Sequence, residues 1–396
     1  MTRSTSAIAA IVAALLATSG AAAQTVKIGI INTLSGPAAS LGVNIDNAIK
    51  LYMKEHEKNL PPGVKIELIR RDDGGPNGEL AKRLAQELIS RDRVQILTGF
   101  TFTPNAAAVA PLATEAKIPM ILMNAGTAVV STLSPYIVRF SFTIWQSCLP
   151  LGEWAARNGI KRVYTTVTDY AGGIDAEQAF AKGFTDAGGQ IVGSVRTPLQ
   201  SPDYVPYLQR VKDAKPDAVF VFVPAGKDAT AYMKAFGDLG LKDAGIKLIG
   251  PGDITTDEEL PNMGDVALGV MTMQHYSAAA TRPANQAFIE AWRREYGPRA
   301  TPSFMSVAAW DAMAAIFDVV REQKGHIDSD RTIALLKGWK TDGSPRGPIM
   351  IDPETRDIVQ NEYLRRVERV NGELANVEID MIPMVKDPWK IINGKR

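Results

Sequence analysis

The hydroxyl groups of three threonines, set in two short loops, are the side chains of this sequence best suited to hold a small anion. Thr101 and Thr103 follow the apolar run Val94–Thr98, and Thr127 follows a second run, Met120–Met123. Thr103 and the proline after it predict the start of a helix, with the threonine as N-cap and the proline at the first helical position. Free backbone amides at a helix N-terminus, with hydroxyls nearby, suit a carboxylate. The same pattern is also common in loops that only connect strands to helices, so a purely structural role for these threonines stays open.

Alternating strands and helices must position these loops. In the first half of the chain we expect strands at Thr25–Ile31, Val64–Ile69, Val94–Thr98 and Met120–Met123, with helices between them. This order, with its short loops, predicts a doubly wound parallel sheet. In open α/β sheets ligands bind at the carboxyl ends of the strands, which is where the threonine loops lie.

The pattern pauses near residues 138–142 and then begins again. The strands expected there are Arg162–Val167, Gln190–Val195, Ala218–Val223, Lys247–Ile249 and Gly269–Met273. Two helices are expected within Asn285–Lys324, and strands at Ile349–Pro353 and Tyr363–Val370. The sequence therefore predicts an α/β protein with two lobes of similar plan.

The first 23 residues have the three parts of a secretory signal peptide. Arg3 supplies the basic start, Ala7–Ala17 is the apolar core, and Ala21–Ala23 offers a small-residue cleavage site. The apolar core is too short to span a membrane. Because no cysteine lies near the expected cleavage site, we expect an exported, soluble protein without a lipid anchor.

The charge balance and the metal-binding residue types exclude several classes of function. The chain of 396 residues has 44 basic and 43 acidic side chains, which leaves no electrostatic footprint for nucleic acid or an anionic membrane. Cys148 is the only cysteine, so no internal disulfide can form, and a buried thiol is favoured over a reactive one. The three histidines, His56, His275 and His326, are too far apart in sequence to predict a zinc site. We expect no cofactor.

Motifs of catalysis are also missing from the sequence. It contains no GxGxxG fingerprint after a strand, no Walker loop and no GxSxG elbow. Asp72, Asp73, Asp169 and Asp253 lie near strand ends, but none pairs with a nucleophile or a metal-binding group. Carboxylates in such loops are more often turn-formers and helix caps. We therefore expect a protein that binds a small molecule and is not an enzyme.

Several short segments, taken in order, resemble the type I periplasmic solute-binding proteins of the branched-chain amino-acid (leucine/isoleucine/valine) family, which serve ABC importers. They are Ile28–Pro37, Lys117–Pro119 with Ala125–Thr127, Asp169–Gly173, and Gly240–Leu241. The resemblance spans essentially the whole chain after the signal peptide. It implies a monomeric periplasmic protein that hands its ligand to a membrane permease.

The resemblance also implies two Rossmann-like lobes joined by three crossovers that act as hinges. The N-terminal lobe would hold residues 24–141 and 275–346, and the C-terminal lobe residues 142–274 and 347–396. The Arg139 guanidinium could clamp an anion, but an ion pair near the hinge is favoured for it. Closure of the lobes around one ligand is the mechanism that such a fold implies.

By similarity, the ligand-binding residues come from loops of both lobes. The candidates are Leu41, Phe100, Thr101, Phe102, Thr103, Ala125, Gly126, Thr127, Tyr170, Ala225, Gly226, Asp253 and Tyr276. The loops at residues 101–103 and 125–127 would hold the carboxylate of the ligand, and the C-terminal lobe would close over it.

The aromatic residues of the first loop distinguish this chain from the amino-acid binders. Phe100 and Phe102 stand where those proteins carry serines, and with Tyr170 and Tyr276 they could stack on a ring. Packing in the core is the other role open to each aromatic. The segments Phe100–Asn105, Asn124–Thr127, Ser134–Arg139 and His275–Ser277 resemble the branch of the family that takes up aromatic carboxylates, and this resemblance implies an aromatic acid, such as a benzoate or phenylpropanoid. The alternatives are a branched-chain or other amino acid, with Asp253 meeting its ammonium group, or a sensor of the same fold.

Overall fold

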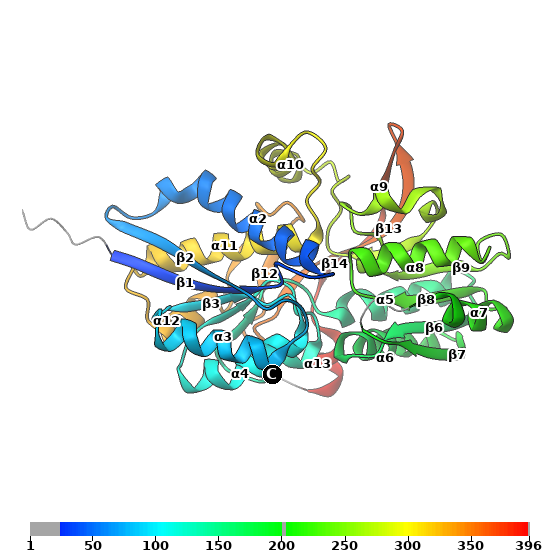
Figure 1. The fold of residues 1–396 in the computed structure, drawn as a ribbon, viewed down its shortest axis with the longest axis horizontal. Helices are drawn as coiled ribbons and strands as arrows, with labels where there is room; N and C mark the ends of the chain where they lie inside the picture. The colour runs from blue at the N-terminus through cyan, green and yellow to red at the C-terminus, as the bar shows by residue number, and fades with distance from the viewer. Residues whose placement is uncertain (1–23, 200–202, 395–396) are drawn as a thin grey trace, which may run out of the picture.

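The computed structural model describes residues 24–199 and 203–394. Two lobes lie side by side along the long axis of the molecule, and each is built around one sheet (Figure 1). The predicted signal peptide, residues 1–23, lies outside the described residues. Within the described ranges, no helix combines the length and the apolar character needed to cross a bilayer.

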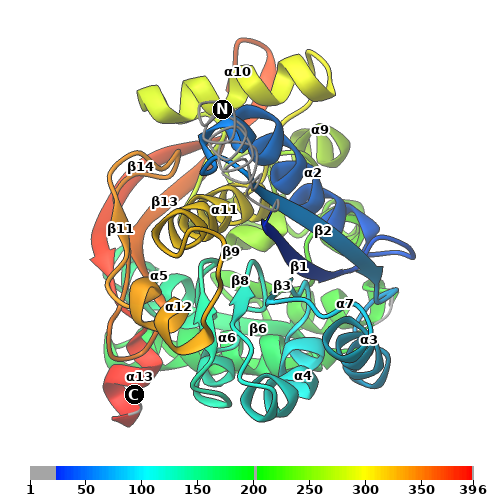
Figure 2. The same ribbon diagram turned by 90° about the vertical axis from the view of Figure 1, so that its left-hand side faces the viewer.

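The sheet of the first lobe has five parallel strands in the order β2-β1-β3-β4-β5. They are β1 (Gln24–Asn32), β2 (Val64–Asp72), β3 (Ile96–Gly99), β4 (Met120–Leu122) and β5 (Ile137–Arg139). Every residue of β3, β4 and β5 is buried, as expected for parallel strands covered on both faces. The helices α2 (Ala39–His56) and α11 (Phe304–Glu322) lie on one side of this sheet, and α3 (Gly78–Ser90) and α4 (Thr103–Glu115) on the other (Figure 2).

The sheet of the second lobe follows the order β11-β12-β13-β10-β9-β8-β6-β7, with β14 paired to β13. Its parallel strands are β6 (Arg162–Thr168), β7 (Gln190–Thr197), β8 (Ala218–Phe222), β9 (Lys247–Pro251) and β10 (Met271–Gln274). Its antiparallel strands are β11 (Lys340–Thr341), β12 (Ile349–Ile351), β13 (Ile358–Val370) and β14 (Glu373–Val385).

Two glycines bring the first helices of the second lobe into close contact. A Cβ atom on Gly152 of α5 (Ile144–Arg157) would lie 2.4 Å from the carbonyl oxygen of Phe180, and one on Gly183 of α6 (Ala171–Asp186) 2.1 Å from that of Leu149. Only glycine permits this approach, which holds the C-terminal half of α6 against α5. The remaining helices are α7 (Val205–Ala214), α8 (Lys227–Asp238), α9 (Leu260–Met263), α10 (Pro283–Tyr296), α12 (Ser329–Leu336) and α13 (Pro388–Asn393).

The chain passes between the two sheets after β5, after β10 and before β11, and three fully buried arginines lie near these passages. Arg139 Nε is 3.1 Å from Asp357 Oδ1, so the predicted ion pair is present. Arg365 donates to the carbonyl oxygen of Tyr276 at 2.6 Å. Arg346 donates to the carbonyl oxygens of Phe140 and Ser141 at 2.7 and 2.9 Å. The three side chains thus tie down the backbone at the crossings.

The predicted α/β fold with two doubly wound lobes is confirmed, and each predicted strand overlaps an observed one. The sequence did not predict β5, β11 and β14, or the short helices α9, α12 and α13. The start of α4 was wrong by one residue: Phe102 is the N-cap, without a side-chain cap, and Thr103 is the first helical residue. The hydroxyl of Thr103 is therefore not used as a cap.

Candidate ligand-binding site

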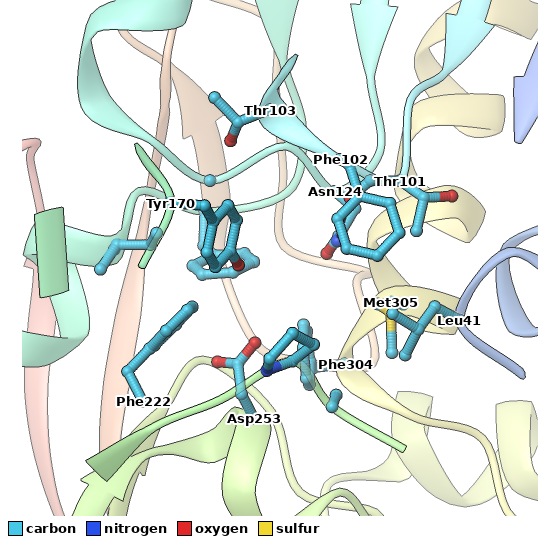
Figure 3. Close-up of a pocket in the computed structure, with 15 residues that line it drawn as sticks. Leu41, Thr101, Phe102, Thr103, Asn124, Tyr170, Phe222, Asp253, Phe304 and Met305 are labelled. Carbon is cyan, nitrogen blue, oxygen red and sulfur yellow. Dashed lines mark hydrogen bonds between the residues drawn. The ribbon is translucent and has the colours of Figure 1, made fainter. Parts of the chain in front are cut away.

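One cavity lies between the two lobes, at the carboxyl ends of strands from both sheets (Figure 3). It encloses about 420 Å³ of atom-free space, a volume that includes open solvent. Its lining comprises Leu41, Thr101, Phe102, Thr103, Asn124, Gly126, Phe142, Ile144, Tyr170, Phe222, Pro224, Ala225, Asp253, Phe304 and Met305.

Two residues with positive φ aim the first loop at this cavity. Gly99 has φ of 99° and Phe100 of 64°. A Cβ atom on Gly99 would lie 2.6 Å from Asn32 Oδ1, so a side chain is excluded there. The turn sends the Phe100 ring into the core of the first lobe, where it is fully buried, and leaves Thr101, Phe102 and Thr103 at the cavity.

The first-lobe wall of the cavity is an uncapped helix N-terminus with hydroxyl groups. The first amides of α4 have no intrahelical acceptor, as at every helix start, and no side chain caps them. Thr103 Oγ1 lies 2.8 Å from Thr127 Oγ1. Asn124 Nδ2 donates to the carbonyl oxygen of Thr101 at 2.7 Å and fixes the loop, whereas its buried Oδ1 has no hydrogen-bond partner within the described residues. This wall offers donors to an anion without a full positive charge.

Aromatic side chains form most of the remaining surface. Tyr170 begins α6 as its N-cap, and its ring centroid lies 6.1 Å from that of Phe222, the last residue of β8. Burial raises the pKa of Tyr170, so the hydroxyl stays protonated. Phe142 and Phe304 meet edge to face at 5.5 Å. Figure 3 shows the rings of Tyr170 and Phe102 standing apart on either side of the cavity.

The one carboxylate that lines the cavity belongs to Asp253. It follows β9 at the start of a 3-10 turn, and the residue is only 7% exposed. Oδ2 of Asp253 has no hydrogen-bond partner among the described residues. Burial raises the pKa of Asp253 to about 7, and Arg365 offsets part of this effect. A buried acceptor without a partner is available to a ligand.

The two lobes touch on either side of residues that line the cavity. The backbone amide of Ala128 donates to Asp175 Oδ2 on α6 at 2.9 Å. Asn44 Nδ2 on α2 donates to Glu258 Oε1 at 3.3 Å. The two lobes are therefore in direct contact in this structure.

Eight of the thirteen predicted ligand-binding residues line the cavity. They are Leu41, Thr101, Phe102, Thr103, Gly126, Tyr170, Ala225 and Asp253. Three more lie directly behind the lining: Thr127 contacts Thr103, Ala125 N donates to Phe100 O at 3.1 Å, and Gly226 is the N-cap of α8.

Phe100 and Tyr276 are not in the lining, and their predicted stacking on a ligand is wrong for this structure. Phe100 packs in the core of the first lobe because of the left-handed turn at Gly99. Tyr276 is fully buried and its hydroxyl donates to Asn285 Oδ1 at 2.8 Å.

Sequence reasoning did not select seven of the lining residues: Asn124, Phe142, Ile144, Phe222, Pro224, Phe304 and Met305. Asn124 and Pro224 could have been found, because each lies in a polar loop after a predicted strand. Phe304 and Met305 open α11, where a Ser303 capping box gives the only local signal.

The other groups considered from sequence have structural roles. Asp72 accepts hydrogen bonds from the amides of Leu34 and Gly74, and Asp73 accepts from the Thr33 hydroxyl. Cys148 is fully buried, and burial raises the pKa of its thiol. Within the described ranges, no group of three or more histidine, cysteine, aspartate or glutamate side chains could hold a metal ion.

Comparison with known proteins agrees with this fold. The sequence model of a family described as periplasmic binding protein matches residues 25–373. A protein named Leu/Ile/Val-binding protein homolog 6, from Brucella melitensis biotype 1, is 42% identical over 374 residues, which are 94% of this chain and 95% of the relative.

Two solved structures from Rhodopseudomonas palustris are also similar. The solute-binding protein of an ABC transporter from strain BisB5, in complex with 3,4-dihydroxybenzoic acid, has a TM-score of 0.89 and 51% identity, and the match covers 93% of this chain and 99% of that one. The solute-binding protein from strain HaA2, in complex with p-hydroxybenzoic acid, has a TM-score of 0.88 and 43% identity, with coverage of 92% and 99%.

Proposed function

The chain belongs to the periplasmic binding protein family, and we propose that it captures an aromatic carboxylate between its two lobes and delivers it to the membrane permease of an ABC importer. It is a solute-binding component and not an enzyme. The observation that carries the ligand assignment is the cavity itself. It joins an uncapped helix N-terminus and the Thr103 hydroxyl to a surface of five aromatic rings, those of Phe102, Phe142, Tyr170, Phe222 and Phe304.

In the proposed complex the carboxylate of the ligand lies at the start of α4. The amides of the first turn and the hydroxyl of Thr103 donate to its oxygens. The ring of the ligand occupies the space between Tyr170 and Phe102, where aromatic faces and edges gain contact energy beyond burial alone. The bound aromatic acids of the two Rhodopseudomonas proteins support this assignment.

The transport role follows from contacts that one ligand makes with both lobes. A ligand shifts the lobes toward the closed state only by the difference between its affinities for the closed and open states. Thr103 belongs to the first lobe and Tyr170 to the second, so a molecule that contacts both favours closure. The lobes proposed for this motion have the boundaries 24–141 with 275–346, and 142–274 with 347–396, except that β11 (Lys340–Thr341) pairs into the sheet of the second lobe. We propose that the mature protein acts as a periplasmic monomer.

Amino-acid binding is the second candidate, because the curated relative is named for leucine, isoleucine and valine and because Asp253 could accept from an ammonium group. A thermal-shift panel on the protein starting at Gln24 separates the two. A ligand at about a hundredfold excess over Kd stabilises the native state by about 2.7 kcal/mol. We expect a shift with benzoates and none with leucine or valine. A shift with leucine or valine and none with benzoates would instead support amino-acid uptake.

A further inference from the structure

We propose that Asp253 selects aromatic acids that carry a ring hydroxyl on the side opposite the carboxylate, so that the cavity prefers hydroxybenzoates to benzoate. This inference rests on the proposed function and deepens it. It assigns a specificity-determining role to a side chain of the second lobe.

The first step is that one oxygen of the Asp253 carboxylate, Oδ2, lacks a hydrogen-bond partner among the described residues. Asp253 is only 7% exposed, and its Oδ2 atom accepts no hydrogen bond within the described residues. It also forms no salt bridge there. The cation that acts on Asp253, Arg365, is engaged elsewhere: it donates to Tyr276 O at 2.6 Å and to Thr272 Oγ1 at 3.2 Å, and it pairs with Asp257 at 4.0 Å. A buried acceptor of this kind costs free energy until a donor reaches it.

The second step is the placement of Asp253 relative to the anion-binding wall. In Figure 3 the hydroxyl of Thr103 lies at the top of the cavity and the carboxylate of Asp253 at the bottom, with the ring of Tyr170 between them. A ligand whose carboxylate lies at the start of α4 therefore has its opposite end beside Asp253.

The third step uses this separation to decide which donor fits. In an α-amino acid, the ammonium and the carboxylate are attached to the same carbon, so an ammonium group would stay near the α4 terminus. A benzene ring places a para substituent at its far end. A phenolic hydroxyl there can donate to Asp253 while the ring fills the aromatic part of the cavity. The hydroxylated ligands of the two similar Rhodopseudomonas proteins agree with this choice.

The test compares three ligands of nearly equal size by isothermal titration calorimetry. 4-Hydroxybenzoate can donate from its para position, and benzoate and 4-fluorobenzoate cannot. At about pH 8, where Asp253 is charged, a hydrogen bond to it contributes enough for the wild-type protein to bind 4-hydroxybenzoate about tenfold tighter, or more, than the other two. In Asp253→Leu, which keeps the size and removes the acceptor, the three affinities should agree within about threefold.

A matched control is Asp243→Leu, which removes an exposed carboxylate of the same lobe and should keep the wild-type preference. Equal affinities of the wild type for all three ligands, or a preference retained in Asp253→Leu, would overturn the role of Asp253 while aromatic-acid binding stands. If none of the three binds the wild type, the proposed function fails as well. Should Asp253→Leu not fold, Asp253→Ala, which also removes the acceptor, takes its place with the same expectation.

Discussion

Oδ2 of Asp175, on helix α6 of the second lobe, accepts a hydrogen bond of 2.9 Å from the backbone amide of Ala128 in the first lobe. Oδ1 of the same carboxylate accepts from Trp145 Nε1 at 2.8 Å, which holds the side chain in place. No ligand atom is needed for this contact. It is therefore a direct link between lobe closure and a residue outside the cavity lining.

Asp175→Asn should weaken ligand binding without touching the ligand. An amide offers only one oxygen, so either Ala128 N or Trp145 Nε1 would face an NH₂ group in the closed form. We expect affinity for the aromatic acid to fall about fivefold to thirtyfold. Calorimetry measures the affinity, and small-angle X-ray scattering should show a more open average shape at subsaturating ligand. Asp186→Asn, on the exposed end of the same helix, is the control. Unchanged affinity in Asp175→Asn would contradict the link.

Thr103→Val should remove one of the donors to the carboxylate. The substitution keeps the shape and deletes the hydroxyl that contacts Thr127. We expect a loss of about tenfold in affinity for benzoates, with little change in melting temperature. Thr103→Ser should recover most of the affinity. Thr114→Val is the control, because that hydroxyl lies on the same helix but bonds Ser134. A loss of similar size in both valine variants would point to damage of α4 instead.

Benzoate binding should weaken as the pH rises through neutrality. The pKa of Asp253 is raised to about 7 by burial, so the side chain is protonated below this pH and charged above it. A bound anion without a donor near Asp253 favours the protonated form, and binding above pH 7 must then take up a proton. We expect affinity to fall by up to about tenfold per pH unit above pH 7. Calorimetry in two buffers of different ionisation enthalpy measures the proton uptake. Asp253→Asn should flatten the profile, and a wild-type profile that is already flat would count against the shifted pKa.

Arg346→Met should destabilise the native state strongly. Its guanidinium is fully buried, pairs with Asp311 at 2.8 Å and donates to two carbonyl oxygens of the first crossover. Loss of the cation leaves Asp311 as an unpaired buried carboxylate, which costs about 3 to 5 kcal/mol. Urea denaturation followed by tryptophan fluorescence measures the free energy of unfolding. The double variant with Asp311→Leu should recover part of the loss, whereas Arg157→Met, in an exposed pair with Glu153, should cost less than about 1 kcal/mol.

The sequence predicted the architecture because burial is encoded in contiguous runs. Strands such as Ile96–Gly99 and Ala218–Phe222 are buried at every position, so they stand out against the helices between them. The strand β14, Glu373–Val385, was missed for the opposite reason. It pairs with β13 alone and is exposed over much of its length, so it has no buried run, although apolar and acidic residues alternate from Val377 to Met381.

The loops of the site were predicted from the sequence. The residues whose position depends on backbone conformation, or on segments distant in sequence, were missed. Phe100 and Phe102 look equivalent in the sequence, and the positive φ of Gly99 and Phe100 turns one ring into the core and leaves the other at the cavity. Phe304 reaches the cavity from about two hundred residues further along the chain. No local pattern shows that this helix start meets the loops of the first lobe, because only the folded crossovers bring them together.

The single buried cysteine makes this protein a convenient scaffold for an optical reporter. Cys148 is fully buried, and the chain has no other thiol, so maleimide dyes have no competing target in the folded protein. Val43 on α2 is 40% exposed and Val205 on α7 is 42% exposed, one on each lobe. Val43→Cys with Val205→Cys would carry a donor and an acceptor dye, and their energy transfer would convert the concentration of an aromatic acid into a colour ratio.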